Sequence, residues 1–393
     1  MQSFYLNLPT EIYFGRKSEE RTAEAVKKQG GSRILLVYGG GSIVRSGLLD
    51  RLMRQLTDAG LTVETLGGVK PNPMLSLARV GVRQALAMQA DFVLGVGGGS
   101  VLDTAKGIAL GAANPDVDIW RFWENEVKPA KALPVGAILT LAAAGSETSD
   151  SAVLTNDETM VKRGLGNPFN RPRFAIMNPE LTFSLPRYQV TCGVVDIMMH
   201  TLDRYFTPTD GNETTDELAE AILRTTVRNG SKAFEDSTAY EPMSELMWCG
   251  SLSHNSMTGL GAAPDFATHQ LGHELSARFD VAHGASLSAV WGSWAQAVYM
   301  AKPARFARYA RTVWGVAETD DAAAAEAGIA ATLSYWRSID MPTNFSELGI
   351  GIQPDAVLTE LAHRCAFFSK RTIGSFKVLD EAAMKAVYQH ANH

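Results

Sequence analysis

The chain has 393 residues, of which 46% are hydrophobic and 20% are charged, and its formal net charge at pH 7 is −6. This length allows two domains of ordinary size, and the composition is that of a soluble globular protein. A nucleic-acid-binding protein would show basic stripes, so the negative net charge argues against that class.

The cysteines and the apolar runs bear on the cellular compartment. Cys192, Cys249 and Cys365 are odd in number and far apart, so they make no disulfide framework. A reducing, cytoplasmic location is therefore expected. No apolar run approaches the roughly 18 residues that a membrane span needs, and the first residues lack the features of a signal peptide.

The first half of the chain alternates short apolar runs with helical patterns. Strands are predicted at 4–6, 11–14, 33–38, 61–66, 91–96, 134–141 and 173–177. Helices are predicted between them at about 17–29, 43–59, 75–88 and 100–112. This alternation predicts a doubly wound parallel sheet of the Rossmann-like kind.

After Leu185 and Pro186 the pattern becomes almost entirely helical. Helices are predicted at about 187–206, 213–235, 240–260, 264–278, 284–301, 303–314, 320–338, 353–367 and 379–391. We therefore predict an α/β dinucleotide-binding domain at 1–184 and an all-helical, metal-binding domain at 185–393. The glycine loops lie in the first domain and the candidate metal ligands in the second, so a site that uses both is expected between them.

The loop Gly97-Gly98-Gly99-Ser100 joins a predicted strand to a predicted helix. Small residues there leave backbone N–H groups open at the positive end of a helix dipole, where a phosphate or pyrophosphate binds. A plain strand-to-helix turn is the alternative, but such a turn rarely needs three successive glycines. The loop matches neither the Gly-x-Gly-x-x-Gly nor the Walker motif.

A second loop, formed by Gly39, Gly40, Gly41 and Ser42, follows the strand at 33–38. In dinucleotide enzymes an acidic residue near the adenosine ribose selects NAD, whereas small and basic residues accept a 2′-phosphate. No acidic residue follows until Asp50, while Arg45 is available as a donor. The loop therefore favours NADP over NAD, with a bare turn as the alternative.

Histidines and one aspartate repeat a four-residue spacing in the second half. Asp196 and His200 form one such pair, His269 and His273 form another, and His283 follows. A helix places residues four apart on one face, and imidazoles with a carboxylate are suitable ligands for a divalent metal. Apolar neighbours surround Asp196, which makes an uncompensated carboxylate costly there. Each pair alone is more often a surface accident or a hydrogen-bonded core pair.

Four motifs carry a resemblance to a known family: Gly97-Gly98-Gly99-Ser100-Val101-Leu102-Asp103, Gly145-Ser146-Glu147, Gly193-Val194-Val195-Asp196 with His200, and His269-x3-His273-Glu274 with His283. In order and spacing they resemble the iron-containing alcohol dehydrogenase family. Within that family the chain is similar to the butanol dehydrogenase-like branch of NADPH-dependent aldehyde reductases. The resemblance covers almost the whole chain.

The resemblance implies roles for individual residues. The implied metal ligands are Asp196, His200, His269 and His283, whereas His273 is expected beside the nicotinamide and the substrate. The implied cofactor-binding residues, besides the loop at 39–42, are Gly98, Gly99, Ser100, Asp103, Asn72, Thr140, Leu141, Ser146, Ser149 and Lys162. Gly40 stands where NAD-using relatives carry an aspartate. A homodimer through the sheet edge of the first domain is expected from the family as well.

These residues predict a hydride transfer between NADP(H) and short aldehydes or primary alcohols. The metal acts as a Lewis acid on the carbonyl, and His273 relays the proton, with a packing role as the alternative. Iron and zinc both fit the ligand set. Phe266, Trp248 and Met257 are candidates for an apolar substrate pocket.

Two other functions compete with this prediction. A dehydroquinate synthase-like or glycerol-phosphate dehydrogenase-like enzyme needs several cationic side chains for its anionic substrate, and only Arg204 and Arg278 lie near the candidate ligands in sequence. A nucleotide sensor with a structural metal needs a closed coordination sphere, which four protein ligands to zinc would allow.

Overall fold

A computed structural model describes residues 1–393. The chain forms two compact units: Asn7–Leu185, and Pro186–His393 together with Met1–Leu6. The strand predicted at 4–6 is wrong, because the first strand begins at Glu11. The start of the chain instead packs on the helical unit, where the N–H of Gln2 donates to the carbonyl of Gly261 at 3.0 Å.

The first unit contains a six-stranded sheet in the order β1-β8-β5-β4-β2-β3, and every neighbouring pair is parallel. The strands are β1 (Glu11–Phe14), β2 (Arg33–Gly39), β3 (Thr62–Val69), β4 (Phe92–Gly97), β5 (Val135–Leu139) and β8 (Phe174–Met177). The helices are α1 (Thr22–Lys28), α2 (Ser42–Arg45), α3 (Leu48–Asp58), α4 (Leu75–Ala87), α5 (Gly99–Ala113) and α6 (Trp120–Trp123). The predicted doubly wound parallel sheet is thus confirmed.

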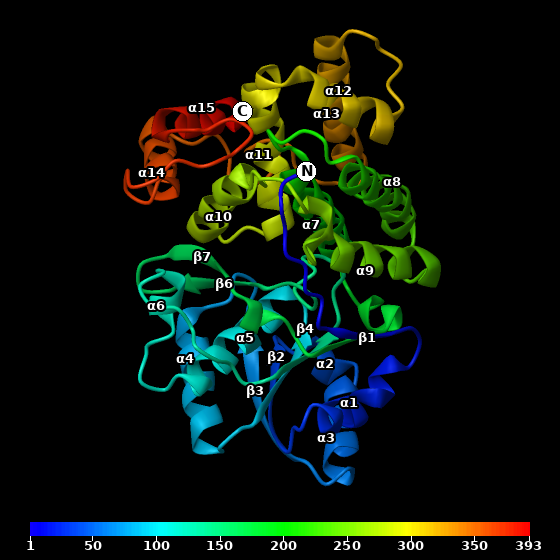
Figure 1. Cartoon of the computed structure of the whole chain (residues 1–393), viewed down its shortest axis with the longest axis vertical. Coiled ribbons are helices and arrows are strands. Elements are labelled where there is room, and N and C mark those ends of the chain that lie inside the picture. The colour runs from blue at the N-terminus through cyan, green and yellow to red at the C-terminus, as the bar shows by residue number, and fades with distance from the viewer. The chain divides into compact units, whose positions relative to one another are not determined.

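Helices cover both faces of this sheet. Along β2, Ile34 and Leu36 pack into one core with side chains of α1 and α3, whereas Leu35 and Val37 pack into another with α4 and α5. Successive strand residues point to opposite faces, so a continuous apolar run is what a strand buried on both sides requires. Figure 1 shows the two helix layers on either side of β2 and β3.

The strand order places the two glycine loops next to each other. Strand β2 pairs with β4, and Tyr38 lies opposite Val96 one step before both strands end. From this pair the sheet grows outward in both directions, to β3 on one side and to β5 on the other. Ligands of open α/β sheets bind in the crevice beyond the carboxyl ends at such a reversal of strand order.

An antiparallel hairpin in this unit was not predicted from the sequence. It consists of β6 (Ser151–Asn156) and β7 (Val161–Gly166). The residues of β7 include two glycines and two cations, so they lack the apolar alternation typical of a strand. The hairpin carries Lys162.

The second unit is all-helical, which confirms the prediction. Its helices are α7 (Arg187–Tyr205), α8 (Glu213–Glu235), α9 (Tyr240–His254), α10 (Ala267–Phe279), α11 (His283–Val298), α12 (Pro303–Trp314), α13 (Asp321–Ser338), α14 (Asp355–Cys365) and α15 (Glu381–Ala391). Helix α7 packs against α8, α9, α10 and α11 and lies in the middle of this unit (Figure 1). None of the helices combines the length and the hydropathy that crossing a bilayer requires.

Candidate active site

Asp196 and His200 lie one turn apart on the buried helix α7. Nε2 of His200 is 3.3 Å from Oδ1 of Asp196, and each residue is only 5% exposed. Because α7 is surrounded by other helices, its polar side chains are buried together with its apolar ones. The carboxylate therefore needs a cation or donors in the protein interior.

Two further helices bring imidazoles to the same carboxylate oxygen. Nε2 of His269, on α10, and Nε2 of His283, the first residue of α11, each lie 3.9 Å from Oδ1 of Asp196. The ligand atoms of Asp196, His200 and His269 all lie within 4.8 Å of one another. The structure thus brings together all four residues that the sequence predicted as metal ligands.

Gly284 explains how α11 comes so close to α7. A Cβ atom at this position would lie 2.2 Å from the carbonyl oxygen of Cys192 and 2.8 Å from its carbonyl carbon. Real Cβ atoms do not approach a backbone this closely, so only glycine allows the contact. Gly284 thereby places His283 beside Asp196, which is one turn beyond Cys192 on α7.

The atoms in this cluster fit a divalent metal. Oδ1 of Asp196 and Nε2 of His269 are buried and have no hydrogen-bond partner, which is costly in a folded protein. Burial, followed by the neighbouring histidines and Arg204, holds the pKa of His200 well below its ordinary value. A neutral imidazole is the form that ligates metal. The missing partner atoms and the neutral imidazole are both what a metal site requires.

Asp203 is a residue of this site that the sequence analysis missed. Its Oδ2 lies 2.5 Å from Nδ1 of His269, and its side chain is fully buried. Burial alone would lower the pKa of His269, but Asp203 and Asp196 beside it raise the pKa above its ordinary value. Asp203 lies seven positions after Asp196, on the same face of α7, and that spacing is the signal that could have identified it.

A further carboxylate residue, Asp265, connects Asp203 to the loop before α15. Its N–H donates to the carbonyl of Asp203 at 2.7 Å, and its Oδ2 accepts from the N–H groups of Ser375 and Phe376 at 2.8 Å each. Burial, followed by the charge of Asp203, raises the pKa of Asp265 to about 6. The loop before α15 is therefore tied to the start of α10.

Other aromatic rings surround the cluster. The rings of His269 and His283 have centres 6.3 and 5.4 Å from that of His273, which is buried one turn along α10. The ring of His254 stacks on that of His200 at 3.9 Å. His254 thus packs directly against a candidate metal ligand.

In the first unit, the predicted phosphate loop is tightly packed. Gly98 precedes α5, and a Cβ atom at Gly98 would lie 2.9 Å from the side chain of Leu141. A Cβ atom at Gly99 would lie 3.3 Å from the side chain of Ala144. Thr140 donates its N–H to the carbonyl of Gly97 at 3.1 Å. The glycines thus bring the first turn of α5 against the segment that follows β5.

Lys106 and Asp103 of α5 hold the loop that contains Ser146 and Ser149. Nζ of Lys106 donates to the carbonyl and hydroxyl oxygens of Ser146 at 2.7 and 2.8 Å, and to the carbonyl oxygens of Ser149 and Ser151 at 3.3 and 2.7 Å. Asp103 accepts from the hydroxyl of Ser146 at 2.7 Å and from the N–H of Val153 at 2.9 Å. Burial lowers the pKa of Lys106 to about 8.

Two more predicted cofactor residues contact each other. Nζ of Lys162, on β7, donates to Oδ1 of Asn72 at 2.9 Å, and both residues are buried. Asn72 has a φ of 56° and lies in the turn before α4. The unpredicted hairpin is therefore the element that carries Lys162 to Asn72.

The loop after β2 is open. A Cβ atom at Gly40 would meet nothing within 4 Å, whereas one at Gly41 would lie 3.4 Å from Nη1 of Arg45. The side chain of Arg45 is exposed. Gly41 has a φ of 110°, a conformation that favours glycine. The loop after β2 therefore offers open space at Gly40 and the positive charge of Arg45.

The chain is similar to known proteins over almost its whole length. Residues 9–179 match the model of the iron-containing alcohol dehydrogenase family, and residues 190–392 match the model of its C-terminal domain. The NADH-dependent butanol dehydrogenase A of Clostridium acetobutylicum is 36% identical over 391 residues, which cover 99% of both chains. The NADPH-dependent aldehyde reductase YqhD of Escherichia coli is 35% identical over 364 residues, which cover 92% of this chain and 93% of the reductase.

Solved structures agree as well. The crystal structure of NADH-dependent butanol dehydrogenase A from Thermotoga maritima superposes with a TM-score of 0.96 at 32% identity and covers 100% of this chain and 99% of that one. That of Escherichia coli YqhD gives a TM-score of 0.94 at 32% identity, with the same coverage. The chain belongs to the iron-containing alcohol dehydrogenase family.

Proposed function

We propose that the protein is a metal-dependent alcohol dehydrogenase that transfers hydride between NADP(H) and short-chain aldehydes or primary alcohols. The observation that carries the proposal is the convergence of His200, His269 and His283 on one buried oxygen of Asp196. Iron(II) and zinc both suit one carboxylate with three imidazoles. A metal held there supplies Lewis acidity that polarises the carbonyl of the aldehyde.

The protein's own residues position the ligands and move the proton. His269 is held by Asp203, so its Nε2 faces Asp196. We propose that His273 relays the proton to the alcohol oxygen, because it is the remaining imidazole beside His269 and His283 and its residue type titrates near neutrality. The nicotinamide supplies the hydride.

We propose NADP as the preferred cofactor. The relatives include enzymes named for NADH and one named for NADPH. Support comes from the open space at Gly40, from the exposed cation Arg45 and from the absence of an acidic side chain in the loop. A 2′-phosphate would meet no repulsion at this position.

The change Gly40→Asp tests the cofactor preference. A carboxylate there repels the 2′-phosphate and accepts hydrogen bonds from the ribose hydroxyls of NAD. The ratio of kcat/KM for NADPH to kcat/KM for NADH should fall at least about tenfold, because two like unit charges about 4 Å apart near a protein surface repel each other by about 4 kcal/mol, more than the roughly 1.4 kcal/mol of a tenfold change. Arg45→Gln should lower the same ratio because it removes a positive charge, and it adds no acidic side chain. A ratio unchanged in both variants would contradict the proposal.

The function itself is tested by NADPH oxidation with butanal. Metal-free enzyme should be inactive, added iron(II) or zinc should restore turnover, and His269→Ala should abolish it while the variant still binds NADPH. Cofactor binding without turnover for any metal and any aldehyde would instead favour the sensor or the lyase-type alternatives.

We further propose a homodimer in the cytoplasm. Phe4, Tyr5 and Leu6 expose apolar side chains, and Tyr5 is 86% exposed, as an unpartnered segment would be. The three cysteines are free thiols, which agrees with a reducing compartment. Sedimentation velocity would show a monomer if the proposed homodimer is wrong.

A further inference from the structure

The ring of Phe266 borders two of the candidate metal ligands. Its centre lies 5.4 Å from that of His269 and 6.5 Å from that of His200. Both imidazoles are buried, whereas Phe266 remains partly exposed. Apolar and aromatic side chains line most of a small-molecule site, with a few polar groups that fix the orientation of the ligand. The carbon chain of an aldehyde bound at the cluster is therefore expected to lie against Phe266.

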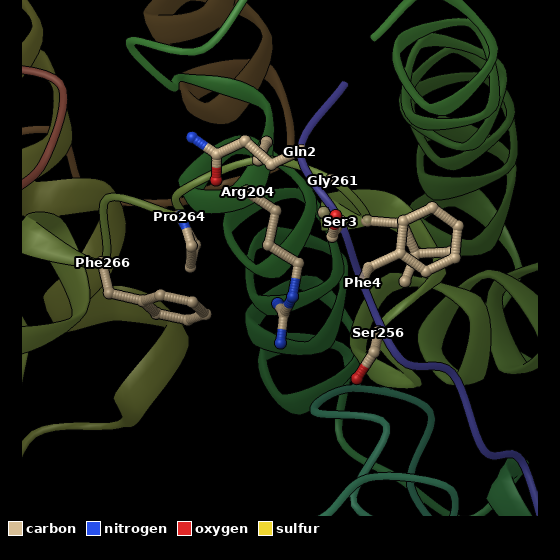
Figure 2. A pocket seen from close by; sticks show the side chains of 11 residues that line it. Gln2, Ser3, Phe4, Arg204, Ser256, Gly261, Pro264 and Phe266 are labelled. Atoms are coloured by element: carbon tan, nitrogen blue, oxygen red, sulfur yellow. The ribbon is translucent and has the colours of Figure 1, made fainter.

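Phe266 also lines a cavity of about 290 Å³ within the helical unit. The start of the chain, from Gln2 to Phe4, forms one wall, and Arg204 of α7 and the loop from Ser256 to Phe266 form the others. Figure 2 shows the rings of Phe266 and Phe4 on opposite sides of the Arg204 side chain. None of the four candidate metal ligands lines this cavity. The Phe266 ring is thus a boundary that the ligand cluster and the cavity share.

The backbone fixes the direction in which the ring points. Phe266 has a φ of 56°, a conformation that bulky side chains rarely adopt, and it immediately precedes α10. Asp265 holds the backbone here, because its Oδ1 accepts from the N–H of Ala267 at 2.9 Å and its own N–H donates to the carbonyl of Asp203 at 2.7 Å. Such strain persists only where the surrounding structure enforces it, and it is common at ligand-binding sites.

The guanidinium of Arg204 holds one face of the ring. Its central carbon lies 4.8 Å from the ring centre, and its Nη1 donates to the carbonyl of His200 at 2.7 Å. A cation is attracted to the face of an aromatic ring. Arg204 therefore connects the ring of Phe266 to the helix that carries His200, and the ring stays beside the cluster.

We infer that Phe266 sets the upper limit on the chain length of the aldehyde, and that the cavity becomes available to the substrate only when this side chain is shortened. The inference rests on the proposed function and refines its substrate class to aldehydes short enough to end at the ring. A carbonyl held at the candidate ligands places its carbon chain against the ring, which stops a longer chain. Phe4, Leu260 and Pro264 give the cavity apolar walls that accept such a chain once the ring is gone.

The test is the dependence of kcat/KM on chain length, measured with NADPH and linear aldehydes from propanal to octanal. In the wild type, kcat/KM should fall for the longest members of the series. In Phe266→Ala the maximum should move to longer chains, and the ratio of kcat/KM for octanal to kcat/KM for butanal should rise at least about tenfold. Each methylene group that the opened cavity removes from water should contribute about fourfold. Phe266→Trp should move the maximum to shorter chains.

The octanal-to-butanal ratio is the informative quantity, because it does not depend on how much of a variant is folded or loaded with metal. Phe266→Gly should raise this ratio as well, and it removes the backbone strain because glycine adopts a positive φ readily. Phe279→Ala is the matched control. Phe279 ends α10 and has the guanidinium carbon of Arg278 at 5.4 Å from its ring centre, but it does not line the cavity. Its ratio should equal that of the wild type.

Three results would overturn the inference while leaving the proposed function intact. The first is an octanal-to-butanal ratio that stays at the wild-type value in both Phe266→Ala and Phe266→Gly. The second is an equal rise of the ratio in Phe279→Ala. The third is inactivity of both shortened variants beside an active wild type, since Phe266 would then maintain the site rather than limit the chain. Absence of wild-type turnover with every aldehyde would instead refute the proposed function.

Discussion

At the scale of single residues, the candidate site depends on a second carboxylate, Asp203, which contacts His269 on the side of the ring opposite to Asp196. Asp203 and Asp196 occupy one face of α7, yet Asp203 contacts the opposite ring nitrogen of His269. A carboxylate in that position fixes the tautomer and the orientation of an imidazole ligand. Asp196, a candidate metal ligand, and Asp203, which orients His269, therefore both come from α7.

The change Asp203→Asn should weaken metal binding about 10- to 100-fold, because an amide orients the ring less strongly than a carboxylate does. Competition with a chelator measures the affinity without any turnover. Asp355→Asn is the control, since Asp355 forms an exposed ion pair with Lys385 in the same unit. If the unfolding midpoint drops while metal affinity stays at the wild-type value, Asp203 is only a packing residue.

At the scale of elements, one glycine sets the separation between two helices. Gly284 lets the start of α11 lie against the backbone of α7 at Cys192. Helices usually pack through side chains at interaxial distances of about 8–10 Å, so this local approach is closer than ordinary packing gives.

We expect Gly284→Ala to push the start of α11 away and to carry His283 with it. Overpacking of this kind typically costs about 1–3 kcal/mol of stability, and metal affinity should fall by more than about tenfold because one of the four candidate ligands moves. Urea unfolding and chelator competition would measure the two effects. Gly166→Ala, where a Cβ atom meets nothing within 4 Å, is the matched control. Wild-type metal affinity in Gly284→Ala would show that His283 is not held by this contact.

The helices of the second unit could be predicted closely from sequence. The predicted helices at 213–235 and 303–314 agree with α8 and α12, because each has a well-defined apolar face. The hairpin at 151–166 could not be predicted, because β7 lacks apolar alternation and the two strands gain their stability by packing against α5 and α6.

The candidate site was partly predictable. The four-residue spacing within each pair, Asp196 with His200 and His269 with His273, showed which residues share a helix face. The approach of α11 depends instead on a contact between Gly284 and Cys192, about 90 positions apart. Asp203 was missed because no histidine lies four residues from it, so its seven-residue spacing from Asp196 was the only local signal. Long-range packing, rather than local pattern, decides both features.

At the scale of the whole molecule, the candidate metal ligands and the candidate cofactor loops belong to different compact units. The candidate metal ligands all lie in Pro186–His393, and the candidate phosphate loops lie in Asn7–Leu185. A ligand stabilises the unit that binds it by mass action, by about 2.7 kcal/mol at a concentration 100 times its dissociation constant.

Hydrogen exchange should therefore separate the two ligands. Adding zinc to metal-free protein should slow exchange in α7, α10 and the start of α11, and removing it with a chelator should reverse the change. NADPH should slow exchange around residues 97–102 instead. Zinc-dependent protection found only in the first unit would contradict the assignment of the metal ligands.

The contact between Gln2 and Gly261 has a consequence for folding during translation. The two residues lie about 260 positions apart, and the N–H of Gln2 donates to the carbonyl of Gly261. At about 5–20 residues per second, synthesis of the chain between them lasts roughly 13–50 seconds. All of the unit formed by Asn7–Leu185 is synthesised within that interval, so this unit can fold before residues 1–6 have a surface to dock on. Docking of residues 1–6 therefore completes the helical unit late rather than early.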